Sequence, residues 1–305
     1  MTEAIDRRGL LFGISAYTVW GFFPIFMALL APAGTFEIVA WRALSSLVVC
    51  LIIIVALRAW SRLWTLVRDP QVMRRLALAS AAIAINWGVM AYAVLTERVA
   101  STALGYYINP LITVALSVIF LGERLRRLQV VAIAIAFVAV VVLAIDMGGV
   151  PWISLGLAIS FALYAFVKKA VGHKVDALSG LTIETGFVAP VAIAVVAAVT
   201  VSGNATLFAR GAEGLGPMHD ALLLTTGTWT AGALLLFAAG ARRLPLNVMG
   251  LLQYIAPTMT FCLSVWYFHE PMPPERWLGF GLVWVALTVL TVDSLLHARR
   301  VRAAA

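Results

Sequence analysis

The sequence predicts an all-α membrane protein with ten transmembrane helices, arranged as two inverted five-helix repeats. Three observations support this prediction: the composition, the spacing of the apolar runs and an internal duplication. Of the 305 residues, 63% are hydrophobic and only 12% are charged, whereas a soluble domain is nearer half apolar and a quarter charged. The excess apolar surface must face lipid, so we expect an integral membrane protein with the bilayer as its partner.

Ten stretches of the chain are long and apolar enough to cross a bilayer, for which a helix needs about 20 apolar residues. They are residues 9–30, 36–58, 74–95, 101–121, 127–145, 151–168, 179–201, 219–241, 246–267 and 274–296. The linkers between them are short, and none could hold a soluble domain. The first stretch is too long for the core of a signal peptide, so we expect it to remain as a helix.

The basic residues predict the orientation of these helices. If the N-terminus is cytoplasmic, eighteen of the 22 Lys and Arg residues lie on the inner side, and only Arg98, Arg210 and Arg276 lie on the outer side. Cytoplasmic loops carry an excess of Lys and Arg. We therefore expect a multi-pass protein of the inner (cytoplasmic) membrane with both termini in the cytoplasm. The net charge of +8 fits anionic lipid better than nucleic acid, which we do not expect as a partner.

Two stretches of the chain repeat one another at an offset of 147 residues. The matched pairs include Tyr107 and Tyr254, Ile108 and Ile255, Pro110 and Pro257, Thr113 and Thr260, and Glu123 and Glu270. The offset is close to half the chain, which indicates a duplication. We predict a first repeat at residues 1–147 and a second at 148–305. Because each repeat has an odd number of spans, the second crosses the membrane upside down, which is typical of secondary transporters.

Other classes of protein find less support in the sequence. Cys50 and Cys262 lie inside apolar stretches, and the four histidines lie in loops or at the ends of spans. There is no metal-binding, nucleophile or phosphate-loop motif, so we expect no catalytic residue, no metal and no cofactor. A selective channel would need a filter-like segment or a ring of charged residues, and the sequence contains neither. A polytopic membrane enzyme and a channel-like permease without alternating access remain the alternatives.

Two charges inside predicted spans are candidates for function, because ionisable groups in a membrane are costly. Arg42 and Glu184 lie at similar depths from opposite faces, which leaves about 13 Å of depth between them and predicts no direct salt bridge. Arg42 could instead snorkel to the outer headgroups, and Glu184 could pair with a lysine at the inner rim. The partners that we expect are Tyr106, Tyr107 or Asn109 for Arg42, and Gln253, Tyr254, Lys168, Lys169 or Lys174 for Glu184.

Aromatic and amide side chains near mid-membrane predict a protein-lined path, since tryptophan otherwise prefers the interface. Pro110 and Pro257 each remove a helical hydrogen bond, and we predict that both act as hinges. Glu123 and Glu270 end their spans, where we expect structural roles. The full set of predicted substrate-binding residues is Trp20, Arg42, Asn86, Trp87, Tyr106, Tyr107, Asn109, Glu184, Trp229, Gln253, Tyr254 and Thr258.

Several motifs resemble the EamA family of the drug/metabolite transporter superfamily, and most closely its RarD branch of chloramphenicol-sensitivity proteins. The stretches are 16–21 with Pro24, 37–42, 86–87, 104–110, 184–185 and 252–258. That branch usually has a histidine where this chain has Trp41, so a proton-carrying role there does not transfer. The resemblance implies a ten-helix transporter that exports small metabolites or drugs. The aromatic and polar residues near mid-membrane separately favour a small amphipathic solute such as an amino acid, and we expect a monomer or homodimer.

Overall fold

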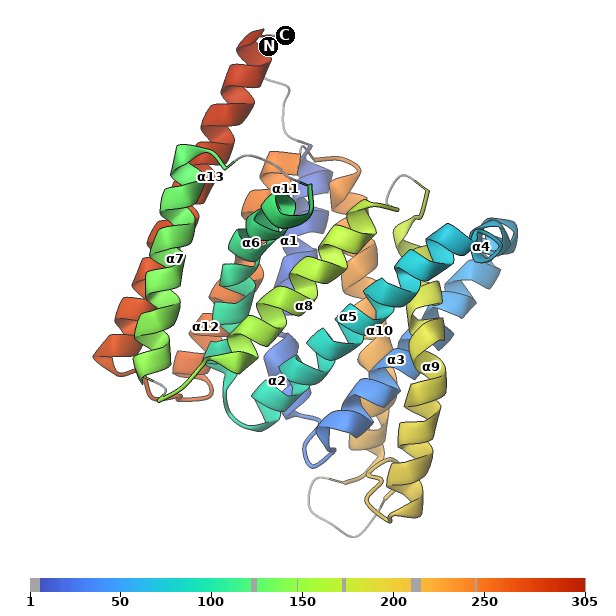
Figure 1. Ribbon diagram of the computed structural model, residues 1–305. Helices are drawn as coiled ribbons and strands as arrows, with labels where there is room; N and C mark the ends of the chain where they lie inside the picture. Colours follow the sequence, from blue (N-terminus) through green and yellow to red (C-terminus); the bar gives the residue numbers. More distant parts are fainter. Residues whose placement is uncertain are drawn as a thin grey trace.

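The protein is an all-helical bundle, shown as a computed structural model in Figure 1. The structure describes residues 6–121, 125–146, 148–171, 174–209, 215–244 and 246–304, and within these ranges no strand occurs. Ten helical segments of the described chain are long and apolar enough to span a membrane. The number of spans predicted from the apolar runs is therefore confirmed, and their ends differ from the predicted ones by a few residues at most.

Eight spans are single helices, and two are each built from a pair of helices. The first span consists of α1 and α2, the ninth consists of α11 and α12, and α4 is a short connecting helix. The bounds are α1 Arg7–Gly21, α2 Phe23–Ala28, α3 Thr35–Ala56, α4 Trp60–Val67, α5 Pro70–Leu95, α6 Val99–Leu121, α7 Arg127–Asp146, α8 Trp152–Lys169, α9 Ala177–Val201, α10 Pro217–Ala241, α11 Leu246–Leu252, α12 Ile255–Trp266 and α13 Pro274–Ala304.

The interruptions in the first and ninth spans lie just before prolines. Helix α1 ends at Gly21, α2 begins at Phe23, and Pro24 lies in the first turn of α2. Helix α11 ends at Leu252, and the break begins at Gln253. Because Pro257 has no N–H group, it cannot donate a helical hydrogen bond to the carbonyl of Gln253. By contrast, α6 continues as a helix through Pro110. The two prolines of the repeat therefore differ in local structure, and their roles as hinges remain predictions.

Counterpart helices of the two predicted repeats pack against each other. Helix α3 packs along α9, and α7 packs along α13 at one edge of the bundle (Figure 1). Helix α6 contacts both α8 and α12, while α10 contacts α3 and α1. An internal two-fold axis in the membrane plane would produce contacts of this kind. The packing is consistent with the inverted arrangement, which itself remains a prediction.

Small residues let α10 approach its neighbours closely, as is common where membrane helices pack. A Cβ added to Gly227 would lie 2.0 Å from the backbone N of Ser46 on α3. At the same crossing, the Gly227 N–H donates to Ser45 Oγ at 2.8 Å, and Ser45 shares a hydrogen bond of 3.1 Å with Thr226. Polar contacts therefore hold the second and eighth spans together in the middle of the protein.

Candidate functional site

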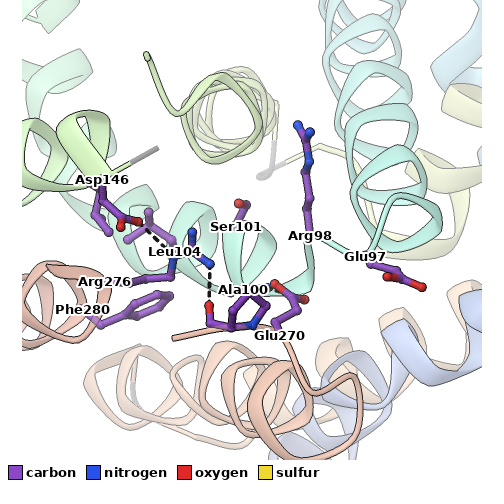
Figure 2. Close-up of a pocket in the computed structure, with 11 residues that line it drawn as sticks. Glu97, Arg98, Ala100, Ser101, Leu104, Asp146, Glu270, Arg276 and Phe280 are labelled. Atoms are coloured by element: carbon purple, nitrogen blue, oxygen red, sulfur yellow. Dashed lines mark hydrogen bonds and ion pairs between the residues drawn. The ribbon is translucent and has the colours of Figure 1, made fainter. Parts of the chain in front are cut away.

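A cavity of about 390 Å³ lies at the end of the bundle that is outer in the predicted orientation (Figure 2). It is bounded by the start of α6, the end of α7 and the α12–α13 connection. Arg276 Nε contacts Asp146 Oδ2 at 3.2 Å across it. The other charged side chains that line the cavity are Glu97, Arg98 and Glu270.

Glu270 ties the α12–α13 connection to α6. Its carboxylate accepts hydrogen bonds from the backbone N–H groups of Val99 and Ala100, in the first turn of α6. Partial burial raises the pKa of Glu270 to about 7. From the sequence repeat we expected only a structural role for Glu270 at the end of a span. Its counterpart in the first repeat, Glu123, lies outside the described residues. The contact between the two segments was not predictable, because it depends on how the loops fold.

Arg42 lies deeper, where the first, second, third and eighth spans meet. It is only 6% exposed, and its Nε donates to Thr230 Oγ1 at 3.0 Å. Its Cζ lies 4.3 Å from the ring centroids of both Phe23 and Trp87, so two aromatic faces hold the cation. A guanidinium enclosed in this way does not snorkel to the headgroups.

Of the partners expected for Arg42 on α6, only Tyr106 interacts with it in the described structure, and none of Tyr106, Tyr107 and Asn109 forms a hydrogen bond with it there. Tyr106 interacts with Arg42 electrostatically, but its hydroxyl donates to Asn86 Oδ1 at 3.1 Å. These partners were expected because their predicted depths in the membrane are similar to that of Arg42. Thr230 and the two aromatic rings come instead from helices whose crossing the sequence does not specify.

Asn86 joins three helices near the Arg42 guanidinium. Its Nδ2 donates to the carbonyl of Leu157 and to Ser160 Oγ on α8, both at 3.1 Å, while Oδ1 accepts from Tyr106. Amide side chains often hold membrane helices together in this way. Asn86, which lies on α5, therefore holds α6 and α8 against α5 beside Arg42.

Tyr107 faces a different group of helices from Tyr106. Its hydroxyl shares a hydrogen bond of 2.8 Å with Thr258 Oγ1 on α12, and its ring packs edge-on against Trp284 of α13. On the same helix, Asn109 Oδ1 is buried without a hydrogen-bond partner in the described structure. Tyr107 therefore links the fourth span to the ninth and tenth spans rather than to Arg42.

The remaining aromatic candidates lie around the first span and the break in the ninth. Trp20 packs against Tyr17 and Phe237 with ring centroids 5.4 and 5.7 Å apart. Trp229, which is 37% exposed, lies 4.9 Å from the ring of Phe26. The last two predicted residues are at the interruption between α11 and α12, and they are Gln253 and Tyr254.

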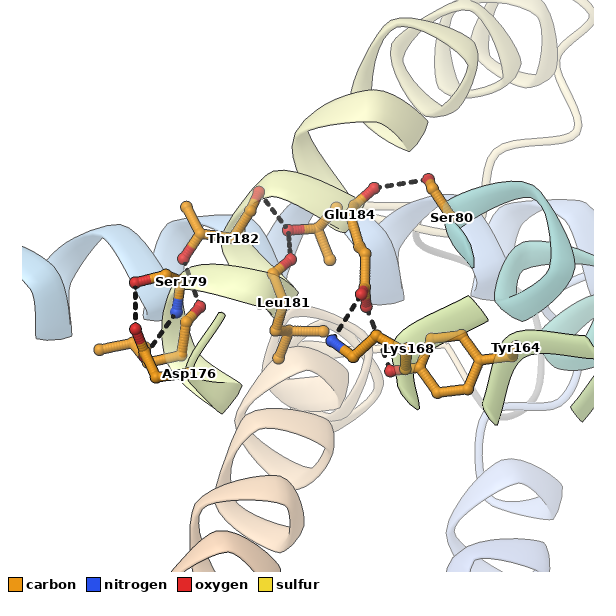
Figure 3. Close-up of polar contacts among 10 residues, drawn as sticks. Ser80, Tyr164, Lys168, Asp176, Ser179, Leu181, Thr182 and Glu184 are labelled. Atoms are coloured by element: carbon orange, nitrogen blue, oxygen red, sulfur yellow. Dashed lines mark hydrogen bonds and ion pairs between the residues drawn. The ribbon is translucent and has the colours of Figure 1, made fainter. Parts of the chain in front are cut away.

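Glu184 is buried, with a compensating cation, near the end of the bundle that is inner in the predicted orientation (Figure 3). Lys168 Nζ lies 2.6 Å from Glu184 Oε1, and the Tyr164 hydroxyl donates to Oε2 at 3.2 Å. Ser80 Oγ donates to the backbone carbonyl of Glu184 at 2.7 Å. Lys168 was one of the partners expected from the sequence, and that expectation is confirmed.

The clusters around Arg42 and Glu184 are separate but connected by aromatic rings. As predicted, no salt bridge joins the two charges among the residues that the structure describes. Phe161 of α8 lies between them, with its ring 5.9 Å from that of Tyr106 and 5.9 Å from that of Tyr164. A row of side chains therefore runs from Arg42 towards the ion pair of Glu184 and Lys168.

Comparison with known proteins agrees with this architecture. The model of the EamA-like transporter family matches residues 7–145 and 147–292. Protein RarD from Streptomyces exfoliatus is 47% identical over 99% of this chain and 93% of its own. The uncharacterized transporter YojE from Bacillus subtilis (strain 168) is 38% identical over 97% of each chain. A solved crystal structure shares the fold, with a TM-score of 0.58 at 20% identity over 98% of this chain and 99% of that one. With ten membrane-spanning helices and matches across nearly its whole length, the chain belongs to the EamA-like transporter family.

Proposed function

We propose that this membrane transporter is a secondary carrier that exports a small metabolite, an amino-acid-like solute or a drug across the cytoplasmic membrane. The main observation is the enclosure of Arg42 by four spans at the centre of the bundle. A charge buried within membrane spans commonly marks a substrate pathway. Both termini are cytoplasmic in this proposal, and the substrate-binding residues are those predicted from the sequence.

The row of aromatic side chains supports one path between the two charges. Arg42 lies at the end of the row nearest the centre, and Glu184 lies with Lys168 at the inner end. Tyr106, Phe161 and Tyr164 occupy the interval. Aromatic walls with a few fixed polar groups suit a small amphipathic solute.

Alternating access follows from the proposed repeats at residues 1–147 and 148–305. Two related halves that cross the membrane in opposite senses provide two arrangements of similar energy, one open to each side. In this scheme the contact between Glu270 and the first turn of α6 belongs to the outer closure. It must break when the carrier opens outwards.

A counterflow screen in reconstituted vesicles tests this function. Arg42→Ala and Glu184→Ala should each impair transport of a solute found in the screen while membrane insertion and expression stay normal. Arg74→Ala and Glu275→Ala are matched controls, because both residues are exposed, and both should transport normally. Normal transport by Arg42→Ala or Glu184→Ala would contradict the role of that residue. Flux without acceleration by solute on the opposite side would favour a channel-like permease.

A further inference from the structure

The positive charge of Arg42 has no counter-ion in the described part of the chain. The buried acidic side chains of the described spans are Glu37, Glu184, Asp220 and Asp293, and none of them forms a salt bridge with Arg42. Glu184 is already neutralised by Lys168. An uncompensated charge inside a membrane protein is costly, which favours a ligand that supplies the missing negative charge.

The contacts of the guanidinium leave one of its edges without a protein partner among the described residues. Phe23 and Trp87 cover its two faces, each with a ring centroid 4.3 Å from Cζ. Thr230 occupies the edge at Nε. The terminal nitrogens Nη1 and Nη2 have no hydrogen-bond acceptor among the described residues. Because a guanidinium donates in its own plane, this edge matches the two oxygens of a carboxylate.

Charge and surroundings define the class of ligand. One uncompensated positive charge is neutralised by a ligand of net charge −1, whereas a zwitterion leaves the site positive and a dianion leaves it negative. The rings of Phe23, Phe26 and Trp229 form a continuous aromatic group next to the cation, with successive centroids 5.9 and 4.9 Å apart. Such walls favour an apolar or aromatic body.

We propose that the Arg42 guanidinium binds the carboxylate of an organic monocarboxylate with an apolar or aromatic body. As a statement about the transported substrate this rests on the proposed function, whereas binding itself does not. The carboxylate takes two hydrogen bonds from Nη1 and Nη2 in the plane of the guanidinium. The aromatic faces stay in place and orient the fork.

Binding to the purified full-length protein in detergent tests the proposal with matched ligands. Benzoate, phenylacetate and 3-phenylpropionate each have a neutral primary amide of almost the same shape, and phenylalanine is the zwitterion related to 3-phenylpropionate. We expect at least one of the three carboxylates to bind at least about tenfold more tightly than its amide, and 3-phenylpropionate more tightly than phenylalanine, since a hydrogen bond to a charged group contributes more than tenfold in affinity. Amides that bind as tightly as the carboxylates, or no binding by any of the three carboxylates, would overturn it.

Variants separate a ligand role for Arg42 from a structural one. Arg42→Gln should lose at least about tenfold in carboxylate affinity, Arg42→Lys should lose less because the charge remains, and the exposed control Arg74→Gln should match the wild type. Removal of an uncompensated buried charge should not lower the melting temperature without ligand. A variant Arg42→Gln that melts lower yet keeps the preference for carboxylates would show a structural role and refute the proposal.

Counterflow with the same ligands separates this inference from the proposed function. If a carboxylate binds through Arg42 but is not carried, the binding inference stands and the transport proposal fails for that solute. If neutral solutes are carried and no carboxylate binds, the inference fails and the proposed function stands.

Discussion

Gly227→Ala should force α3 and α10 apart at the centre of the protein. The added Cβ would lie 2.0 Å from the backbone N of Ser46 and 2.6 Å from Ser45 Oγ. An ordinary contact begins at 3.4 Å, so the helices must separate locally by about 1.4 Å, the difference between 3.4 and 2.0 Å. Backbone atoms cannot swing away as a flexible side chain can, and the interface itself must therefore open.

The expected destabilisation combines overpacking with lost hydrogen bonds. Overpacking a close contact costs about 1–3 kcal/mol. Three hydrogen bonds cross this interface, from Gly227 to Ser45, between Ser45 and Thr226, and from Arg42 to Thr230. Each contributes on average about 0.6 kcal/mol in a membrane protein. We therefore expect a loss of about 3–5 kcal/mol and a melting temperature lower by at least about 5 °C.

Thermal melts of the purified protein, followed by the fraction that stays monodisperse after heating, measure this effect. Gly232→Ala is the matched control, because it lies on the same helix and its added Cβ would meet nothing within 4 Å. The melting temperature of Gly232→Ala should equal that of the wild type. If Gly227→Ala also melted with the wild type, the close crossing of α3 and α10 would be refuted.

Three further predictions follow from the topology and from the charged contacts. Reporter fusions after Arg68 and after Asn204 should report the cytoplasmic and the outer side respectively, and one side for both would contradict the predicted orientation. Lys168→Met should leave the buried Glu184 carboxylate without its cation and lower the free energy of unfolding by about 3–5 kcal/mol. Lys168→Arg should retain most of the wild-type stability because the positive charge remains. An unchanged melting temperature for Lys168→Met would argue against the ion pair. The pKa of Glu270 is raised from its ordinary 4.5 to about 7 in the contact with α6, so the contact binds a proton more tightly than an exposed carboxyl does and weakens as the pH rises through about 7. Hydrogen–deuterium exchange in the first turn of α6, corrected for the intrinsic effect of pH, should therefore increase between pH 6 and 8 in the wild type but not in Glu270→Gln, and equal profiles would contradict this linkage.

The ten spans were predictable because length and apolarity alone define a membrane helix. The same criterion missed α4, whose residues Trp60–Val67 are too few and too polar on one face to resemble a span. It also could not distinguish Pro110, which α6 accommodates, from Pro257, before which the ninth span is interrupted. That difference depends on the packing of neighbouring helices, which cannot be predicted from a single sequence.

The candidate charges were predictable for a related reason, since charges within spans are rare and stand out. Lys168 was a predictable partner of Glu184 because both lie near the same membrane face. Thr230 was not a predictable partner of Arg42, because the two are 188 positions apart and meet only where α3 crosses α10. The cavity beside Glu270 was missed altogether, since it lies between the start of α6, the end of α7 and the α12–α13 connection, whose relative positions follow from the folded bundle.

Access to the central site from the two sides of the membrane tests the proposed mechanism most directly. The thiol of Tyr106→Cys, in a background of Cys50→Ala and Cys262→Ala, can be labelled by a membrane-impermeant reagent added to either face of oriented vesicles. Alternating access predicts labelling from both faces, and a disulfide between Ala100→Cys and Glu270→Cys should abolish labelling from the outer face while increasing it from the inner face. Labelling from one face only without the disulfide, or no reciprocal change with it, would contradict the account.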